Sequence, residues 1–359
     1  GPRYAARLAD AAAGAGAVLR TGVSATGWAG PRTLDTTGPD GLERVTARAV
    51  VLATGARERP RSARMVPGTR PAGVLTTGEL QQTVHLHGGR VGRRAVVVGS
   101  ETVALHAVRT LRAAGTRVVA LVTDDPCGPF QSPWHRVPVI TEAAVAELTG
   151  RGRLAGVRLR GSDGSSTFLD CDTIVFTGDW IPDHELARLG GAAIDPGTRG
   201  PAVDTAFRTS LPGVFAVGNL LHGVEPAVMA AAEGRRAAAH VLSHLAGAGP
   251  WPHGQVPLHV EHPLLWAAPN RLSPDGRPPV DGRFTLRTAQ RLARPVLLVS
   301  QGGRELDRQQ LPRTALPGRA VHLRADWITR ADPGGGPVRV GVMSDFRQPD
   351  RGTARILAV

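Results

Sequence analysis

The chain has 359 residues, of which 42% are hydrophobic and 20% charged, a balance typical of a globular protein with two or three domains. Its formal charge of +13 rests on 43 arginines and no lysine; these arginines are dispersed, and aromatic residues make up only 4%, which argues against a nucleic-acid surface. The sequence contains neither an apolar run of about 18 residues nor a signal-peptide pattern, so we expect no membrane span. Its two lone cysteines fit a reducing compartment, so we expect a cytoplasmic location.

The first 90 residues predict a helix, a small β-meander and a second helix. Residues 3–13 have helical composition, and short strand-like segments with turn signals then lead to the apolar strand of VVLATG, residues 50–55. The Arg- and Pro-rich segment 56–75 predicts a connection. A helix is expected over Thr77–Leu86, because capping residues open an amphipathic stretch.

A β–turn–helix–β unit begins at Arg94. The strand runs into VVVGSETVA, residues 96–104, a helix follows with Gly115 as its C-cap, and the next strand covers Arg117–Val122. A Pro-rich loop over 126–140 should then lead to a helix near Thr141–Leu148. A hairpin with an SDG turn and the apolar strand of DTIVFTG complete this region.

The last third predicts a long helix and a separate β domain. LPGVFAVGN ends a buried strand, and the helix begins near Glu225–Ala227 with Pro226 in its first turn. Residues 247–257 have the composition of a linker. The short strands beyond it, separated by Gly and Pro, predict a sandwich-like domain.

Few residues suggest chemistry by themselves. Cys127 and Cys171 are the only cysteines and form no C-x-x-C motif, so we expect neither a zinc or iron–sulfur site nor a redox-active disulfide. His85 and His87 have no third ligand nearby in sequence, so no metal is predicted. Trp134-His135 could face a substrate or only cover the fold. No catalytic residue is identified.

Three motifs carry a family resemblance: ATG at 53–55, VVVGSETVA at 96–104 and TSLPGVFAVGN at 209–219. Their order and spacing resemble the two-dinucleotide-domain flavoproteins, the pyridine nucleotide–disulfide oxidoreductase superfamily. DTIVFTGDWIPDHELARLGG and VFAVGNLLHGVEPAVMAAAEGRRAA are also similar to the large subunits of sarcosine oxidase, opine oxidase and hydrogen cyanide synthase. The resemblance covers the chain up to the end of the long helix.

The resemblance implies an α/β fold in which an FAD domain contains an inserted, Rossmann-like NAD(P) domain. Residues 1–75 and 171–247 would form the FAD domain, 76–170 the NAD(P) domain, and 256–345 the small β domain. The family's first FAD-binding turn would precede residue 1, and the chain does not begin with Met. We therefore expect part of a longer flavoprotein, with weakened FAD binding in the chain alone.

The resemblance also implies where FAD would bind. The turn after residue 52 and the strand end near residue 218 would lie beside the flavin and its ribityl chain. The N-terminus of the long helix would face the flavin ring. From the residues themselves, we expect Asp179-Trp180 to form a turn between strand and helix near the flavin, with a structural role. The implied FAD-binding residues are Thr54, Gly55, Ala56, Gly218, Asn219, Glu225 and Ala227.

The second nucleotide turn departs from the G-x-G-x-x-G pattern. Gly99 and Ser100 fit it, but Glu101 stands where the second glycine would admit a diphosphate. Two unit charges about 4 Å apart repel by about 4 kcal/mol at an effective dielectric of ~20, so NAD(P) binding is doubtful here. We hypothesise that Glu101 itself accepts the N–H groups of the helix in place of a phosphate.

The resemblance implies an FAD-dependent oxidoreductase. Hydride would pass between the flavin and either NAD(P)H or a small amine, amino acid or opine-like substrate. The alternative is a non-catalytic subunit that uses degenerate nucleotide turns as a docking scaffold in a hetero-oligomer. A small-molecule substrate and a protein partner subunit are thus the two partner classes to test.

Overall fold

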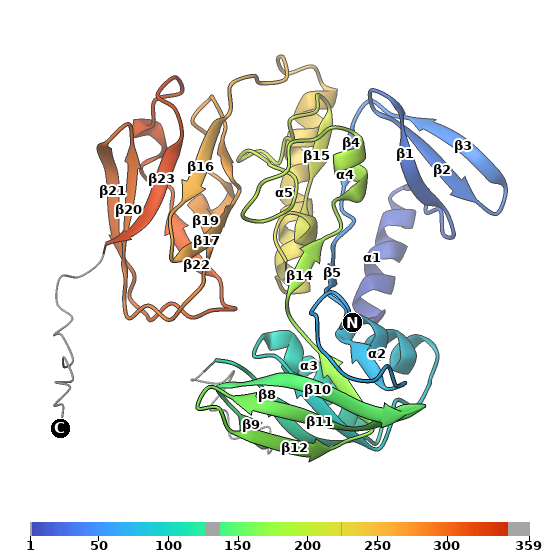
Figure 1. Ribbon diagram of the computed structural model, residues 1–359. Helices are drawn as coiled ribbons and strands as arrows, with labels where there is room; N and C mark the ends of the chain where they lie inside the picture. Colours follow the sequence, from blue (N-terminus) through green and yellow to red (C-terminus); the bar gives the residue numbers. More distant parts are fainter. Residues whose placement is uncertain (1, 126–136, 224, 344–359) are drawn as a thin grey trace, which may run out of the picture. The chain divides into compact units, whose positions relative to one another are not determined.

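The computed structural model describes residues 2–125, 137–223 and 225–343, so Cys127, Trp134 and His135 lie outside the described residues (Figure 1). The described chain confirms the predicted α/β class and divides into two compact units. Unit 1 consists of Gly1–Pro201 with Thr209–Ala246, and unit 2 of Ala202–Arg208 with Gly247–Val359. No helix among the described residues is both long and apolar enough to cross a membrane.

A three-stranded antiparallel meander follows the first helix of unit 1. The elements are α1 (Pro2–Gly14), β1 (Ser24–Gly30), β2 (Thr33–Gly38) and β3 (Gly41–Thr46). The apolar strand expected at the end of the meander, β4 (Val50–Leu52), belongs to a different sheet. It pairs in parallel with β15 (Val214–Ala216), a strand from the other end of unit 1.

A five-stranded parallel sheet forms the Rossmann-like part of unit 1, in the order β6-β13-β7-β8-β9. Its strands are β6 (Val74–Thr76), β7 (Arg94–Val98), β8 (Arg117–Val122), β9 (Val139–Ile140) and β13 (Thr173–Phe176). The expected helix over Thr77–Leu86 consists of α2 (Thr77–Gln81) and a π-helical turn over Gln82–Leu86. The second helix, α3 (Thr102–Ala113), connects β7 to β8 as predicted.

Both faces of this sheet are covered, which explains its nearly continuous apolar strands. Ala95 and Val97 of β7 pack in one cluster with Val108 and Leu111 of α3. Val96, which points to the opposite face, packs with Leu148 and other residues of an antiparallel sheet. That sheet consists of β10 (Ala143–Arg151), β11 (Arg153–Gly161) and β12 (Ser166–Asp170).

The helix predicted near Thr141–Leu148 is wrong, because this segment forms β10. Its Ala- and Glu-rich composition favours a helix, but the segment pairs along its whole length with β11. Leu148 is completely buried in the cluster beneath the parallel sheet. Tertiary pairing and burial therefore override local helix propensity.

The remaining elements of unit 1 are a two-stranded ribbon, a short helix and the long helix. The segment 56–75, expected as a connection, contains β5 (Ala56–Glu58), which pairs with β14 (Trp180–Pro182) as a two-stranded antiparallel ribbon. A short helix, α4 (Glu185–Leu189), follows this ribbon, and the long helix α5 covers Ala227–Leu245. Pro226 precedes the first helical residue of α5 and occupies the N-cap instead of the first turn.

Unit 2 contains two sheets that share one hydrophobic cluster, as expected for a sandwich-like β domain. Phe284 and Trp327 stack at its centre with ring centroids 5.5 Å apart. One sheet consists of β18 (Arg271–Leu272), β16 (Val256–Val260), β23 (Val338–Met343), β20 (Val296–Gln301) and β21 (Arg304–Gln310). The other consists of β17 (Leu264–Ala268), β19 (Arg283–Thr288) and β22 (Val321–Arg324).

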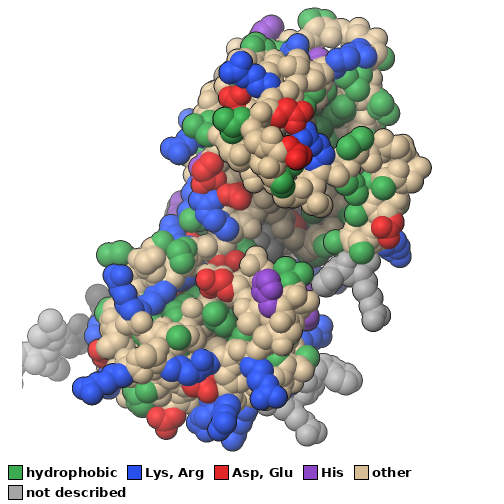
Figure 2. Space-filling view, turned by 90° about the vertical axis from the view of Figure 1, so that its right-hand side faces the viewer, with side chains coloured by type: hydrophobic (Ala, Val, Ile, Leu, Met, Phe, Trp, Pro, Cys, Tyr) green, Lys and Arg blue, Asp and Glu red, His purple; other side chains and the backbone are tan. Residues whose placement is uncertain are grey.

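Charged side chains are mixed on the surface. On the face shown in Figure 2, arginine side chains lie in separate groups, interspersed with acidic and apolar ones. Several arginines of the chain form exposed ion pairs, as between Arg44 and Asp35 or between Arg308 and Glu305. Such pairs contribute little to stability.

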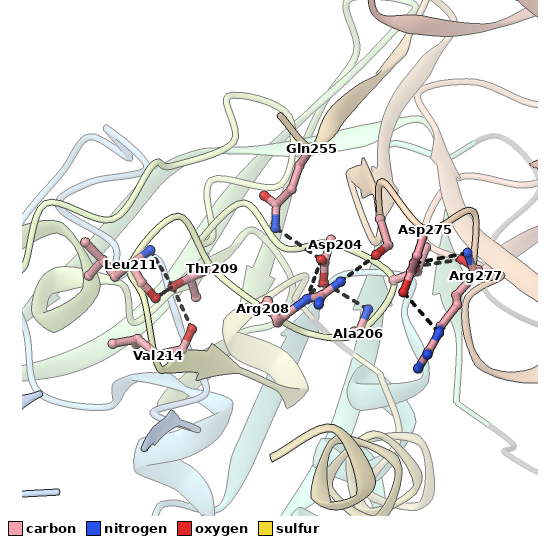
Figure 3. Close-up of polar contacts among 11 residues, drawn as sticks. Asp204, Ala206, Arg208, Thr209, Leu211, Val214, Gln255, Asp275 and Arg277 are labelled. Carbon is pink, nitrogen blue, oxygen red and sulfur yellow. Dashed lines mark hydrogen bonds and ion pairs between the residues drawn. The ribbon is translucent and has the colours of Figure 1, made fainter. Parts of the chain in front are cut away.

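A buried carboxylate holds the segment 202–208 within unit 2 (Figure 3). Asp204, with no exposed surface, accepts hydrogen bonds from the backbone N–H groups of Ala206 and Arg208. It also accepts from Arg208 Nε at 2.8 Å and from Gln255 Nε2 at 3.1 Å. Arg208 in turn donates to the Ser273 hydroxyl. These bonds join a segment that precedes β15 to the later β domain.

We predict that Asp204→Ala destabilises unit 2 by about 3–5 kcal/mol, because Arg208 is left mostly buried without its carboxylate. Hydrogen exchange of the β16 and β23 amides in the full-length protein measures this loss. Glu305→Ala is the matched control, since it removes a carboxylate of unit 2 from the exposed pair with Arg308 and should cost less than about 1 kcal/mol. Equal protection in both variants would contradict the prediction.

Candidate functional site

Two of the three sequence motifs meet at one edge of the parallel pair β4–β15. Ala216 lies opposite Leu52, and Val217 donates its N–H to the Leu52 carbonyl at 3.0 Å. Because the strands are parallel, the residues that follow them emerge at the same edge. Ligands of α/β sheets characteristically bind at the carboxyl ends of such strands.

The turn after β4 has an open backbone. Gly55 adopts φ +80°, and among the described residues, its two chain neighbours aside, no atom lies within 4 Å of the position that a Cβ would take. The Thr54 hydroxyl donates to the Asp183 carbonyl at 2.7 Å, while the Asp183 N–H donates to the Gly55 carbonyl at 2.9 Å. Ala56 then pairs with Pro182 in the ribbon. The turn is thus fixed to the end of β14 but leaves space beside its glycine.

The ribbon carries a compact group of charges. Arg57 forms ion pairs with both Asp183 and Glu185. Hydrogen bonding from Arg57 lowers the pKa of Glu185 to about 2. Burial raises the pKa of Asp183, and the neighbouring Glu185 raises it further. One arginine therefore holds two carboxylates next to the turn that contains Gly55.

The turn after β15 is closed by side-chain bonds to the segment before α5. Gly218 adopts φ +72°. The Asn219 amide oxygen accepts from the Glu225 N–H at 3.0 Å, and its nitrogen donates to the Glu225 carbonyl at 3.4 Å. This reciprocal pair brings Asn219 and Glu225 together directly before Ala227. The amide oxygen keeps one lone pair for a further donor.

Sequence reasoning missed Glu233, which braces the same turn from within α5. Its carboxylate accepts from the Gly218 N–H at 2.8 Å and lies 3.1 Å from His222 Nε2. His222 is buried, with only 4% of its side chain exposed. The one sequence signal was an acidic residue in an alanine-rich stretch of the helix, AAAEG.

The start of α5 presents backbone N–H groups near these residues. The N-cap, Pro226, makes no side-chain capping bond, and the helix is 19 residues long. The first-turn amides from Ala227 onward therefore carry the partial positive charge of the helix N-terminus.

The second nucleotide turn lies elsewhere in unit 1, between β7 and α3. Gly99 adopts φ +138°, and a Cβ there would lie 1.9 Å from Thr177 Oγ1. Ser100 is half-buried between Gly99 and Glu101, the N-cap of α3. The hypothesis that Glu101 accepts the helix N–H groups is wrong, because its side chain makes no capping bond. Its Oε2 accepts instead from the Thr177 hydroxyl at 2.9 Å.

Cys171 has no suitable environment for redox chemistry. The residue is 3% exposed, and burial raises the pKa of its thiol to about 12. A thiol needs to ionise before it can attack a disulfide or a carbon centre. Cys171 is therefore a structural residue of the cluster between the sheets.

We predict that native Cys171 resists alkylation by iodoacetamide at about pH 8, by at least ~100-fold relative to the unfolded chain, whose thiol has an ordinary pKa of about 8.5. Mass spectrometry of the peptide that contains Cys171, from a full-length Cys127→Ser variant, measures the labelling of this thiol. The same protein in concentrated urea is the control. Rapid labelling of the folded protein would show that the thiol is neither buried nor protonated.

Comparisons with known proteins agree with this architecture. Residues 18–234 match the family described as pyridine nucleotide-disulphide oxidoreductase. The chain is 26% identical over 212 residues to the mitochondrial dihydrolipoyl dehydrogenase of Caenorhabditis elegans, a match covering 54% of this chain and 41% of that protein. It is 24% identical over 185 residues to the glutamate synthase [NADPH] small chain of Escherichia coli, covering 43% and 39%. The chain thus spans about two fifths of each curated relative.

Solved structures show the same fold. The thioredoxin reductase of T. acidophilum superposes with a TM-score of 0.57 at 22% identity, over 69% of this chain and 81% of that one. The bacillithiol disulfide reductase of Bacillus cereus gives 0.54 at 19% identity, over 69% and 78%. The narrower resemblance to sarcosine oxidase, opine oxidase and hydrogen cyanide synthase subunits is not confirmed by these comparisons and stays a prediction.

Proposed function

The chain belongs to the pyridine nucleotide-disulphide oxidoreductase family, and on this basis we propose that it is the core of an FAD-dependent oxidoreductase. Hydride would pass between the flavin and either NAD(P)H or a small amine, amino acid or opine-like substrate. The observation that carries the proposal is the convergence of the β4 turn, the β15 turn and the start of α5. Such a convergence is the usual place for a cofactor in this class of sheet.

The residues at this edge fit FAD. The open space beside Gly55 allows a ligand to approach the backbone closely. The N-terminus of α5 would stabilise negative charge on the flavin ring, and the second lone pair of Asn219 would accept from a ribityl hydroxyl. When bound, FAD supplies the hydride acceptor. The residues proposed to hold it are Thr54, Gly55, Ala56, Gly218, Asn219, Glu225 and Ala227.

Two buried polar atoms near the β4 turn support a bound group there. Within the described part of the chain, Trp180 Nε1 and His184 Nδ1 are buried and have no hydrogen-bond partner. Trp180 lies close to Gly223, where a Cβ would come within 2.6 Å of the Trp180 Cβ and 3.7 Å of the Ala56 Cβ. Unsatisfied buried polar atoms are costly, and a ligand with polar groups would satisfy them.

The proposed reaction does not use a dithiol of this chain. The sequence has two cysteines that are 44 positions apart, 127 and 171, and Cys171 is buried with a raised pKa. Direct hydride transfer between the flavin and a second molecule needs no protein thiol.

The decisive experiment is to express the complete open reading frame and record its visible spectrum. A flavin band that an amine, an amino acid or NADH bleaches without oxygen would support the proposal. A protein that carries no flavin, even when reconstituted with FAD, would contradict it and favour the docking-scaffold alternative.

We predict that Thr54→Val weakens FAD binding about tenfold in that protein, because the β4 turn loses its hydroxyl bond to Asp183. Thr149→Val is the matched control, since Thr149 also donates its hydroxyl to a backbone carbonyl but lies in β10. Equilibrium dialysis against FAD compares the two variants. Equal affinities would show that the β4 turn is not part of the FAD site.

A further inference from the structure

The turn after β7 places a carboxylate where a dinucleotide-binding turn has its second glycine. In the G-x-G-x-x-G pattern, that glycine lets the diphosphate approach the backbone. Gly99 and Ala104 occupy the first and third glycine positions, and Ala104 is completely buried against the sheet. The turn therefore keeps the shape of a nucleotide site and differs at the position that would contact the diphosphate, Glu101.

The Glu101 carboxylate fills the hollow of the turn. A Cβ on Gly178 would lie 1.9 Å from Glu101 Oε1, and a Cβ on Gly99 would lie 2.7 Å from Oε2. These two glycines follow neighbouring parallel strands, since Val98 of β7 lies opposite Phe176 of β13. The carboxylate thus occupies the space above both strand ends.

The end of β13, next to the Glu101 carboxylate, is held by contacts of Thr177 and Arg64. Thr177 is buried and supplies the hydroxyl that contacts Glu101 Oε2 at 2.9 Å. Arg64 Nη2 donates to the carbonyls of Thr177 and Gly178, at 3.1 and 2.6 Å. The Arg64 guanidinium also lies over the Phe176 ring, 5.4 Å from its centroid.

Charges of both signs lie around Arg64. Burial lowers the pKa of Arg64, and the negative charges of Asp179 and Glu101 oppose that effect. Glu101 thus stands near a half-buried arginine, where a diphosphate would otherwise bring its negative charge.

We propose that Glu101 is a specificity-determining residue that closes the second dinucleotide turn to NAD(P)H. The carboxylate excludes the diphosphate by occupying its space and by repelling its charge, a repulsion on the order of a thousandfold in affinity at a separation of about 4 Å. This inference rests on the proposed function. It narrows the choice of hydride donor, since NAD(P)H is excluded and the organic substrate then reduces the flavin.

NADH titration of the full-length protein, followed by nucleotide fluorescence, tests this inference without depending on FAD. The wild type should show no saturable binding below about 1 mM, which corresponds to weaker than about −4 kcal/mol. Glu101→Gly, which removes both bulk and charge, should bind at least ~100-fold more tightly. Glu101→Gln keeps the bulk and should recover only part of this gain.

Glu147→Gln is the matched control, because Glu147 lies in the same unit and forms an exposed ion pair with Arg158 at 3.6 Å. It should behave as the wild type does. Micromolar NADH binding by the wild type, or unchanged binding in both Glu101 variants with their circular dichroism intact, would overturn the inference. If Glu101→Gly does not fold, Glu101→Gln still decides, since removal of the charge alone must increase affinity.

The visible flavin spectrum separates this inference from the proposed function. If the protein retains FAD but binds NADH tightly, the inference that Glu101 excludes NAD(P)H is wrong and the proposed function stands. A protein without FAD in which Glu101→Gly gains NADH affinity supports the closure and contradicts the oxidoreductase.

Discussion

The pairing of β4 with β15 determines where every proposed FAD contact lies. Three residues on each strand form the pair, and flanking bonds from Val50 to Gly213 and from Val217 to Leu52 extend it. The whole Rossmann-like part is inserted between these two strands in sequence. The chain leaves through β5 and returns through β14, and the bonds of Thr54 and Gly55 to Asp183 fix the two passages together. A very short sheet therefore holds together segments that are remote in sequence.

The two nucleotide-type turns of unit 1 share a backbone conformation but differ in the space beside their glycine. In each, a glycine with positive φ follows a parallel strand. Beside Gly55 the space is open, whereas beside Gly99 the chain's own Glu101 and Thr177 occupy it. An open turn can receive a ligand, and a filled turn behaves as a small polar core. The backbone arrangement is thus similar in both turns, and the space beside the glycine differs because of Glu101 and Thr177.

Most elements could be predicted from the sequence because their patterns are local. The strand–turn–helix of 94–122, the hairpin around Asp163 and the long helix α5 all follow from periodicity and turn residues. Residues 141–148 could not be predicted, because their strand pairing depends on β11 and on a buried face. Glu101 was expected to bond to its nearest helix amides, but its partner Thr177 comes from another strand. Glu233 was missed because its contacts with Gly218 and His222 form only when α5 packs against the turn after β15.

The short segment 202–208 has a consequence for the order in which the molecule is completed. It leaves the ribosome before β15 and α5, yet its hydrogen-bonding partners, such as Gln255, Asn270 and Ser273, come from unit 2. The bonds of Asp204 to Ala206 and Arg208 lie within the segment itself, whereas its bond to Gln255 needs the later β domain. A β domain cut out from residue 247 onward would lack this segment and with it the bonds to Gln255 and Asn270. Unit 2 is therefore discontinuous in sequence, since seven of its residues precede the last part of unit 1.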